Sequence, residues 1–348
     1  MDENVLISAI KSLQGGSTLS VDESYGSIGF IMGGNACPEL IASFLSLLAT
    51  RVPTGEELYG ASMVMRECSK KIIFKNPETI LDTCGTGGAP KTFNVSTAAS
   101  ILIASCGVRV AKHGNRSRTG RGSAEVLEKI GVNLDANVDQ QKYCLENVGI
   151  CFCFAPKHHS AVANVAPVRK LLPFPTLFNL LGPLTNPCGA GLQMLGVWDK
   201  KYMKPIANAL QLSGTNSSAV VHSMDGLDEI SISSPTHVLY VNKKSIIEDV
   251  IDPKNIGLSY SPIENVRATS LTHAAQIIED VLINGREGGC RDMVVLTAGV
   301  SLFLSGVAQS AREGVEMASK AIDSGKSRDT LHHWVEASNK HIPSTNNN

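Results

Sequence analysis

The sequence predicts an α/β protein in which a small N-terminal helical domain precedes a larger α/β domain with a mostly parallel central sheet. Up to about residue 71, apolar residues recur at helical spacing without a strand pattern, whereas after Pro77 short β-branched runs alternate with helical patterns. The length of 348 residues also exceeds the usual size of one domain. We expect a helical domain at 1–72, joined in space by part of 160–187, an α/β domain at 73–343 and a frayed tail at 344–348.

The helical domain is predicted from three local patterns. Apolar residues of 5–13 recur about once per helical turn, and 40–48 reads as a buried helix. Thr54 is a candidate N-cap, and Glu57 follows three residues later as in a capping box. Helices therefore account for the chain before residue 72.

The α/β domain is predicted from short runs rich in β-branched residues. We expect strands at 79–81, 108–111, 149–154, 219–222 and 293–296, with an added strand at 237–241 followed by a long connection. Because helical patterns separate most of these runs, they indicate βαβ units and a mostly parallel sheet.

The composition argues against a protein that binds nucleic acid, a membrane surface or structural zinc. The formal net charge of -1 provides no global basic field, so neither nucleic acid nor a membrane surface is an expected partner. The nine cysteines lack the doubled spacing of a zinc site and are expected to be reduced thiols, mostly in the core. No basic leader and no long apolar run occur, which indicates a cytoplasmic protein.

The first candidate binding segment runs from 82 to 100, between a predicted strand and a predicted helix. Its glycines allow the backbone to approach a ligand closely, and the N-terminus of the helix favours an anion. Hydroxyl and amide side chains at Thr92, Asn94, Ser96 and Thr97 add hydrogen-bonding groups. The alternative is a plain tight turn with Asn94 or Ser96 as a helix cap. We favour a phosphate-binding loop.

The second candidate segment runs from 111 to 125 and again joins a predicted strand to a helix that begins near Ser123. It holds Lys112, Arg116, Arg118 and Arg121, four cations within ten residues, which would repel one another unless an anion neutralised them. A diphosphate fits this requirement. A solvated basic loop is the alternative, and a nucleic-acid backbone is disfavoured because no aromatic residues interleave to stack on bases.

Two further groups of residues suggest a metal and a carboxylate site. Asp225, Asp228 and Glu229 follow a predicted strand, and oxygen ligands in that position suit Mg²⁺, although an exposed Asp-Gly turn is the alternative. Arg169 would pair well with a substrate carboxylate. The pair at 158–159 would need a third protein ligand to hold zinc, and the sequence indicates none.

In this order, the motifs resemble those of the anthranilate phosphoribosyltransferase family over nearly the whole chain. They are Gly-Thr-Gly-Gly, Asn-Val-Ser-Thr, Lys-His-Gly-Asn-Arg-Ser, His-His, Ala-Pro-Val-Arg, Phe-Asn-Leu-Leu-Gly-Pro-Leu-Thr-Asn-Pro and Asp-Gly-Leu-Asp-Glu. The resemblance implies transfer of the 5-phosphoribosyl group from phosphoribosyl diphosphate to the amine of anthranilate in tryptophan biosynthesis. It also implies Mg²⁺ as cofactor and a homodimer that associates through the helical domain.

The resemblance assigns roles to particular residues. Contacts to the donor are implied for Gly85, Gly88, Ala89, Thr92, Asn94, Val95, Ser96, Thr97, Lys112, His113, Gly114, Asn115, Arg116, Ser117 and Ser123. Contacts to anthranilate are implied for Gly85, His113, Asn115 and Arg169, and magnesium ligands for Ser96, Asp228 and Glu229. Lys112 and Arg116 would stabilise the departing diphosphate electrostatically, and no residue is assigned as an acid or base.

The sequence departs from the family pattern at two places. Ala89 stands where the family usually has Asp, in a loop that is one residue short, and the stretch 118–121 replaces a serine-rich segment. Both changes make the pocket more cationic, so we expect tighter donor binding or a lower magnesium demand. The rival functions are a pyrimidine nucleoside phosphorylase-like enzyme and a non-catalytic, nucleic-acid-binding relative.

Overall fold

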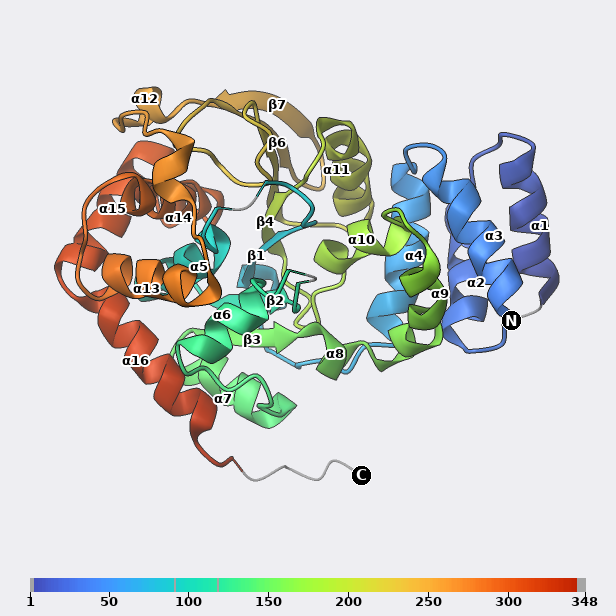
Figure 1. The fold of residues 1–348 in the computed structure, drawn as a ribbon, viewed down its shortest axis with the longest axis horizontal. Helices are drawn as coiled ribbons and strands as arrows, with labels where there is room; N and C mark the ends of the chain where they lie inside the picture. The colour runs from blue at the N-terminus through green and yellow to red at the C-terminus, as the bar shows by residue number, and fades with distance from the viewer. Residues whose placement is uncertain (1–2, 91, 118, 343–348) are drawn as a thin grey trace.

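The computed structural model describes residues 3–90, 92–117 and 119–342 of the chain. A helical unit packs beside a larger α/β unit, as the right and left halves of Figure 1 show. The predicted fold class is confirmed. The expectations for Arg118 and the tail 344–348 lie outside the described residues, as does residue 91 of the first candidate segment.

The helical unit begins with four helices whose apolar faces share one core. These are α1 (Glu3–Gln14), α2 (Val21–Met32), α3 (Pro38–Ala49) and α4 (Gly55–Glu67). Leu6, Ile28, Phe44 and Leu58 from the four helices are all fully buried in this core. The predicted capping box at the start of α4 is confirmed, because the Thr54 hydroxyl accepts from the Glu57 amide and the Glu57 carboxylate accepts from the Thr54 amide.

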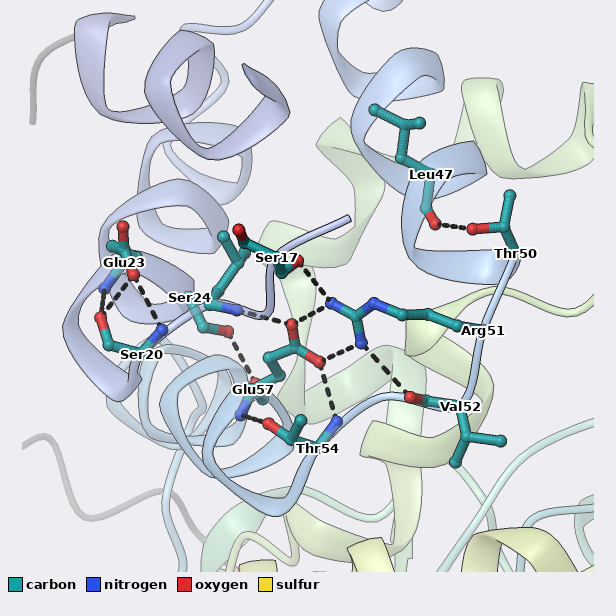
Figure 2. Close-up of polar contacts among 11 residues, drawn as sticks. Ser17, Ser20, Glu23, Ser24, Leu47, Thr50, Arg51, Val52, Thr54 and Glu57 are labelled. Atoms are coloured by element: carbon teal, nitrogen blue, oxygen red, sulfur yellow. Dashed lines mark hydrogen bonds and ion pairs between the residues drawn. The ribbon is translucent and has the colours of Figure 1, made fainter. Parts of the chain in front are cut away.

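A buried ion pair joins the loops of the helical unit (Figure 2). The Glu57 carboxylate is fully buried and accepts hydrogen bonds from both terminal nitrogens of Arg51, at 2.8 and 2.5 Å. It also accepts from the amide of Leu19 at 2.8 Å. One carboxylate therefore holds the α1–α2 loop against the α3–α4 loop.

The α/β unit is built on one seven-stranded sheet with the order β3-β2-β1-β4-β5-β6-β7. The strands are β1 (Leu81–Gly85), β2 (Val110–Gly114), β3 (Ile150–Phe154), β4 (Leu192–Gly196), β5 (Ser217–Ser223), β6 (Thr236–Val241) and β7 (Ile246–Ile251). Strands β1 to β5 are parallel, whereas β6 pairs antiparallel with both β5 and β7. The carboxyl ends of five strands thus meet at one edge, where open α/β sheets bind their ligands.

Most of the remaining helices cover the two faces of the sheet, whereas those at 166–171 and 177–181 pack against the helical unit. The remaining helices are α5 (Val95–Ser105), α6 (Ser123–Lys129), α7 (Val138–Asn147), α8 (Ala155–His158), α9 (Ala166–Leu171), α10 (Leu177–Leu181), α11 (Met203–Leu212), α12 (Pro253–Ile256), α13 (Leu271–Leu282), α14 (Gly289–Leu304), α15 (Ala311–Asp323) and α16 (Lys326–Asn339). Short 3₁₀ turns lie at η1 (Pro77–Thr79), η2 (Ser160–Asn164), η3 (Gly182–Leu184), η4 (Lys200–Tyr202) and η5 (Ile263–Val266). Within the described residues, none of the helices has the length and apolarity required to cross a bilayer.

Alternate residues of the central strands belong to different cores. Val221 and Val238 pack in the core that contains α5 and α14, whereas Val220 and Leu239 pack in the core that contains α1 to α4 and α11. Because successive side chains of a strand point to opposite faces, the sheet is covered on both sides. Val165, Phe178 and Leu184 belong to the second core. We therefore propose that the boundary between the two domains lies at residue 72 and that part of 160–187 belongs to the helical unit.

Three elements differ from the expected strands. The expected strand at 293–296 is wrong, because these residues lie inside α14, where nearly every side chain is buried. A short apolar run does not distinguish a strand from a helix that is buried all round. Strand β4 went unpredicted because 192–196 contains no β-branched residue, and β7 because Glu248 and Asp249 occupy its middle.

Candidate active site

The glycine-rich loop leaves the carboxyl end of β1 and enters α5. Gly87 and Gly88 adopt φ values of +67° and +99°, which side-chain-bearing residues rarely adopt. A Cβ atom on Gly88 would lie only 3.4 Å from Cγ of Trp198, so the loop rests directly on the indole. The loop is also fastened to β4, because the Thr86 amide donates to the Gly196 carbonyl at 2.9 Å and the Trp198 amide to the Thr86 hydroxyl.

A buried ammonium faces the N-terminus of α5. Lys112 lies on β2, is 2% exposed, and donates from Nζ to the Thr83 carbonyl at 2.5 Å and to Oγ of Ser96 at 3.2 Å. Burial lowers the pKa of Lys112, and the nearby carboxylates of Asp82 and Glu229 counteract that shift. The positive charge is thus held at the helix end where backbone amides already favour an anion.

Two adjacent carboxylates reach the same place from the β5–β6 connection. Glu229 accepts from the Thr92 hydroxyl at 2.8 Å and from the Ser96 backbone amide. Asp228 lies against the end of β1, since a Cβ atom on Gly85 would be 3.0 Å from its Oδ2. Burial and repulsion by Asp228 raise the pKa of Glu229 to about 8. A divalent cation would relieve this repulsion, so the carboxylates fit a magnesium site.

Asp225, the third carboxylate of that group, has a different environment. Its Oδ2 accepts from the hydroxyls of Ser231 and Ser233, each at 2.6 Å. These bonds overcome the effect of burial and lower the pKa of Asp225. Asp225 therefore stabilises its own loop.

The basic loop leaves β2 and enters α6. Gly114 packs under the side chain of Ser123, because a Cβ atom there would be 2.3 Å from the Ser123 Oγ. The Asn94 amide group donates to the Arg121 carbonyl at 3.2 Å, which brings the two predicted phosphate loops into contact. Asn115 is exposed at the start of the loop. The structure thus assembles most predicted donor residues at one sheet edge.

Contrary to the expectation from the sequence, the cations of this loop that the structure describes have protein partners and do not need a bound anion to hold them together. Arg116 forms an exposed, two-pronged ion pair with Glu128 of α6 at 2.9 and 3.0 Å. The Arg121 guanidinium donates to the Ala268 carbonyl. Lys112 is held by Thr83, as described above. Each of these three cations therefore has a partner within the protein, and the Arg116 side chain bonds to α6.

His113 connects the basic loop to the segment beyond β3. Its backbone amide donates to Oδ1 of Asp82 at 2.9 Å, its Nδ1 lies 3.0 Å from the Gly182 carbonyl, and its ring centroid lies 5.1 Å from that of His159. Burial and the two neighbouring histidines lower the pKa of His113 to about 3. The imidazole is therefore neutral at physiological pH and suits a positioning role better than proton transfer.

Arg169 lies on α9, which packs against the helical unit. Its guanidinium carbon is 5.0 Å from the centre of the Phe178 ring, and the side chain is partly buried. In Figure 1, α9 lies on the side of the helical unit, whereas the two loops belong to the α/β unit. An acceptor bound through Arg169 would therefore lie between the two units.

Sequence reasoning missed two residues that shape the site. Trp198 supports the glycine loop, and its indole ring packs against Tyr202 with centroids 4.6 Å apart. Gly196 is required at the end of β4, because a Cβ atom there would overlap the Asp228 carbonyl. The available signals were an aromatic residue and a glycine beside a strand end, but that strand was itself not predicted.

Two family models match the chain in sequence order. The helical bundle domain of a glycosyl transferase family matches residues 7–69, and the a/b domain of that family matches residues 77–328. The fold and the site therefore define a two-domain enzyme of this glycosyl transferase family.

Individual relatives show which family of glycosyl transferases the chain belongs to. An anthranilate phosphoribosyltransferase from Hyphomonas neptunium is 42% identical over 97% of this chain and 99% of its own length. The crystal structure of anthranilate phosphoribosyltransferase from Thermus thermophilus matches with a TM-score of 0.89 and 33% identity, covering 95% of this chain and 99% of that one. The Saccharomyces cerevisiae enzyme in complex with PRPP and Mg has the same fold, with a TM-score of 0.86, 24% identity and coverage of 97% and 98%. The chain belongs to the anthranilate phosphoribosyltransferase family.

Proposed function

We propose that this protein transfers the 5-phosphoribosyl group of phosphoribosyl diphosphate to the amine of anthranilate and releases diphosphate, a step of tryptophan biosynthesis. The observation that carries the proposal is the buried Lys112 ammonium beside Ser96, at the N-terminus of the helix that follows the glycine loop. The names of the relatives support the same reaction.

The donor would bind between the two loops. Its contacts are proposed for Gly85, Gly88, Ala89, Thr92, Asn94, Val95, Ser96, Thr97, Lys112, His113, Gly114, Asn115, Arg116, Ser117 and Ser123. Glycine amides and the α5 N-terminus suit the phosphate oxygens, and Lys112 supplies a charge that is already desolvated. Arg116 is the weakest member of this group, because Glu128 competes for its guanidinium.

Magnesium would be held by Ser96, Asp228 and Glu229. The raised pKa of Glu229 supports this set, because a neighbouring cation would convert a costly carboxylate pair into ligands. When bound, Mg²⁺ neutralises charge that develops on the diphosphate as it leaves. Ala89 supplies no carboxylate to this pocket, which agrees with the proposed tighter donor binding or lower magnesium demand.

In the reaction, the bond between C1 of the ribose and the diphosphate oxygen breaks, and the anthranilate nitrogen bonds to C1. The amine is weakly basic and enters unprotonated, so no side chain is needed to activate it before attack. The enzyme acts mainly by positioning and electrostatics. Arg169 would hold the acceptor carboxylate, with Gly85, His113 and Asn115 around the ring.

The protein is proposed to act as a cytoplasmic homodimer that associates through its helical unit. Neither nucleic acid nor a membrane is a proposed partner, in agreement with the net charge of -1.

Anthranilate fluorescence provides the test. Emission should fall when the purified protein is mixed with anthranilate, phosphoribosyl diphosphate and Mg²⁺, and it should not fall when the donor is omitted. Unchanged emission in the complete mixture would contradict the proposal. Phosphorolysis of a pyrimidine nucleoside by the same preparation would favour the phosphorylase-like alternative, and tight binding of single-stranded nucleic acid would favour the non-catalytic one.

A further inference from the structure

Three buried cysteines converge outside the candidate active site. The sulfur atoms of Cys151, Cys153 and Cys188 all lie within 4.8 Å of one another, and the residues are 1%, 0% and 3% exposed. Cys151 and Cys153 occupy alternate positions of β3 and therefore share one face of the strand, whereas Cys188 comes from the loop after η3. Tertiary structure alone brings Cys188 to the other two.

The electrostatics of this cluster differ from those of a cysteine buried alone. Hydrogen bonds from the thiols of Cys151 and Cys153 lower the pKa of Cys188 below its ordinary value of 9.0, although burial opposes the shift. Cys144 is also buried, but it lies outside the cluster, and burial raises its pKa to about 12. The thiolate form, which is the form that binds metals, is thus favoured at Cys188. The hydrogen bonds with Cys188 and burial raise the pKa values of Cys151 and Cys153, so these two thiols would release their protons when a metal binds.

A histidine with a free ligand atom lies close by in the chain. Nδ1 of His158 is 2.6 Å from the Lys70 carbonyl, so this nitrogen carries the proton and Nε2 keeps its lone pair. His158 is 1% exposed, and its Nε2 has no hydrogen-bond partner within the described residues. A backbone carbonyl on the opposite ring nitrogen is the usual arrangement of a metal-binding histidine. The charges of His158 and Cys188 influence each other, but the His158 ring nitrogens lie outside the group of ligand atoms that the three sulfurs form, so the imidazole would approach the sulfurs when a metal binds.

We propose that Cys151, Cys153 and Cys188 bind one thiophilic divalent cation of the Zn²⁺ type, with His158 as the fourth ligand. Three thiolates and one imidazole form a common tetrahedral set for structural zinc. A divalent ion leaves this site with one net negative charge, whereas Cu⁺ would leave two, and residual charge is costly in a buried site. Simple core packing accounts for the burial of the thiols, but it does not account for their convergence or for the unpartnered imidazole.

Two of the proposed ligands, His158 and Cys188, lie in segments that bond to residues 68–76, the link between the two units. The Lys70 amide donates to the His158 carbonyl at 2.8 Å, and the Ile72 amide donates to the Pro187 carbonyl at 3.2 Å. The link is thus hydrogen-bonded both to the end of α8, which carries His158, and to the loop that carries Cys188. A bound cation would fasten these segments together, so its effect falls on the stability of the junction, and the chemistry of ribosyl transfer does not use it.

Cobalt provides the probe, because Co²⁺ enters zinc sites and its spectrum reports thiolate ligands. The reduced full-length protein should bind one equivalent of Co²⁺, with a thiolate-to-cobalt charge-transfer band and intense tetrahedral d–d bands, and Zn²⁺ should abolish both. A magnesium site made of oxygen ligands would give no charge-transfer band. Absence of that band in the wild-type protein would overturn the proposal without recourse to any variant.

Matched variants locate the site. Cys188→Ala should lose the charge-transfer band, whereas Cys144→Ala, which removes a buried thiol outside the cluster, should keep it. His158→Gln should keep the band and shift the d–d spectrum. Zn²⁺ should raise the melting temperature of the wild-type protein and of Cys144→Ala. A band that persists in Cys188→Ala would overturn the proposal, and if that variant does not fold, Cys151→Ala serves the same comparison.

Discussion

Glu57 in the helical unit is fully buried and Glu229 at the sheet edge is partly buried, and their surroundings shift their pKa values in opposite directions. Glu57 meets Arg51 and the amides of Leu19 and Thr54, which together overcome the effect of burial and lower its pKa. Among the described residues, Glu229 accepts from the Thr92 hydroxyl and the Ser96 amide and is attracted by Lys112, but burial and repulsion by Asp228 outweigh these interactions and raise its pKa to about 8. The first carboxylate has its charge compensated within the fold, whereas the second would gain a partner when a cation binds.

The largest effect is expected from the loss of Arg51, the ion-pair partner of Glu57. Arg51→Met should reduce the free energy of unfolding by about 3 kcal/mol, because it leaves a buried charge without a counter-ion. Urea denaturation measures the change. Arg286→Met is the control, since Arg286 and Asp280 form an exposed pair, and it should move the midpoint little. An equal loss of unfolding free energy in the two variants would show that burial of Glu57 does not increase the contribution of its ion pair to stability.

The largest effect at the sheet edge should come from Lys112. Lys112→Met should lower kcat by a factor on the order of 10²–10³, because it removes a preorganised charge from the leaving group. Its stability should change little, because the desolvation cost of the ammonium that is removed is offset by the loss of its attraction to the carboxylates of Asp82 and Glu229. Steady-state kinetics and urea denaturation measure the two effects. Lys129→Met, on the exposed side of α6, is the control, and a near-wild-type kcat for Lys112→Met would refute the role.

Magnesium dependence tests the carboxylate pair. Glu229→Gln should raise the Mg²⁺ concentration needed for half-maximal activity by about 10–100-fold, because one ligand charge is lost. An activity titration with Mg²⁺ measures this shift. Asp225→Asn is the matched control, because that carboxylate bonds to Ser231 and Ser233, and its magnesium requirement should not change. Equal shifts in both variants would remove Glu229 from the metal site.

The pH dependence of stability should also differ between the two carboxylates. Between its ordinary pKa of 4.5 and its folded value of about 8, Glu229 stays protonated in the folded state only, so stability falls as pH rises. The advantage of Glu229→Gln over the wild-type protein should therefore grow from about pH 5 to about pH 8 in the absence of Mg²⁺. Glu57 behaves oppositely, since its stabilisation is lost only as pH falls below 4.5. A stability difference that is independent of pH would contradict the raised pKa of Glu229.

The smallest effect is expected at Arg116. Because its guanidinium is committed to Glu128 on the surface, Arg116→Ala should change the KM for phosphoribosyl diphosphate little. Glu128→Gln, which releases the guanidinium, is the complementary variant. The KM for phosphoribosyl diphosphate, measured for both variants, shows whether the Arg116 guanidinium binds Glu128 or the donor. A large rise in this KM for Arg116→Ala would show that Arg116 contacts the diphosphate.

The local sequence was sufficient to predict those elements that carry a sequence pattern of their own. The Thr54–Glu57 capping box, the glycines before α5 and most parallel strands depend on neighbouring residues, and these features were predicted. Prediction failed where the signal was ambiguous or absent. The run 293–296 looked like a strand because burial on all sides removes helical periodicity, and β4 was missed because it contains no β-branched residue.

By itself, the sequence determined the two-part α/β architecture, the candidate phosphate loops and the family, because glycines, caps and apolar periodicity act over a few residues. Only the tertiary structure decided which charges meet. It paired Arg116 with Glu128, placed Asp228 against Gly85, put Trp198 beneath the glycine loop, and brought Cys188 to the cysteines of β3. These contacts join segments that are distant in sequence, and the charge and burial of each group depend on those distant neighbours.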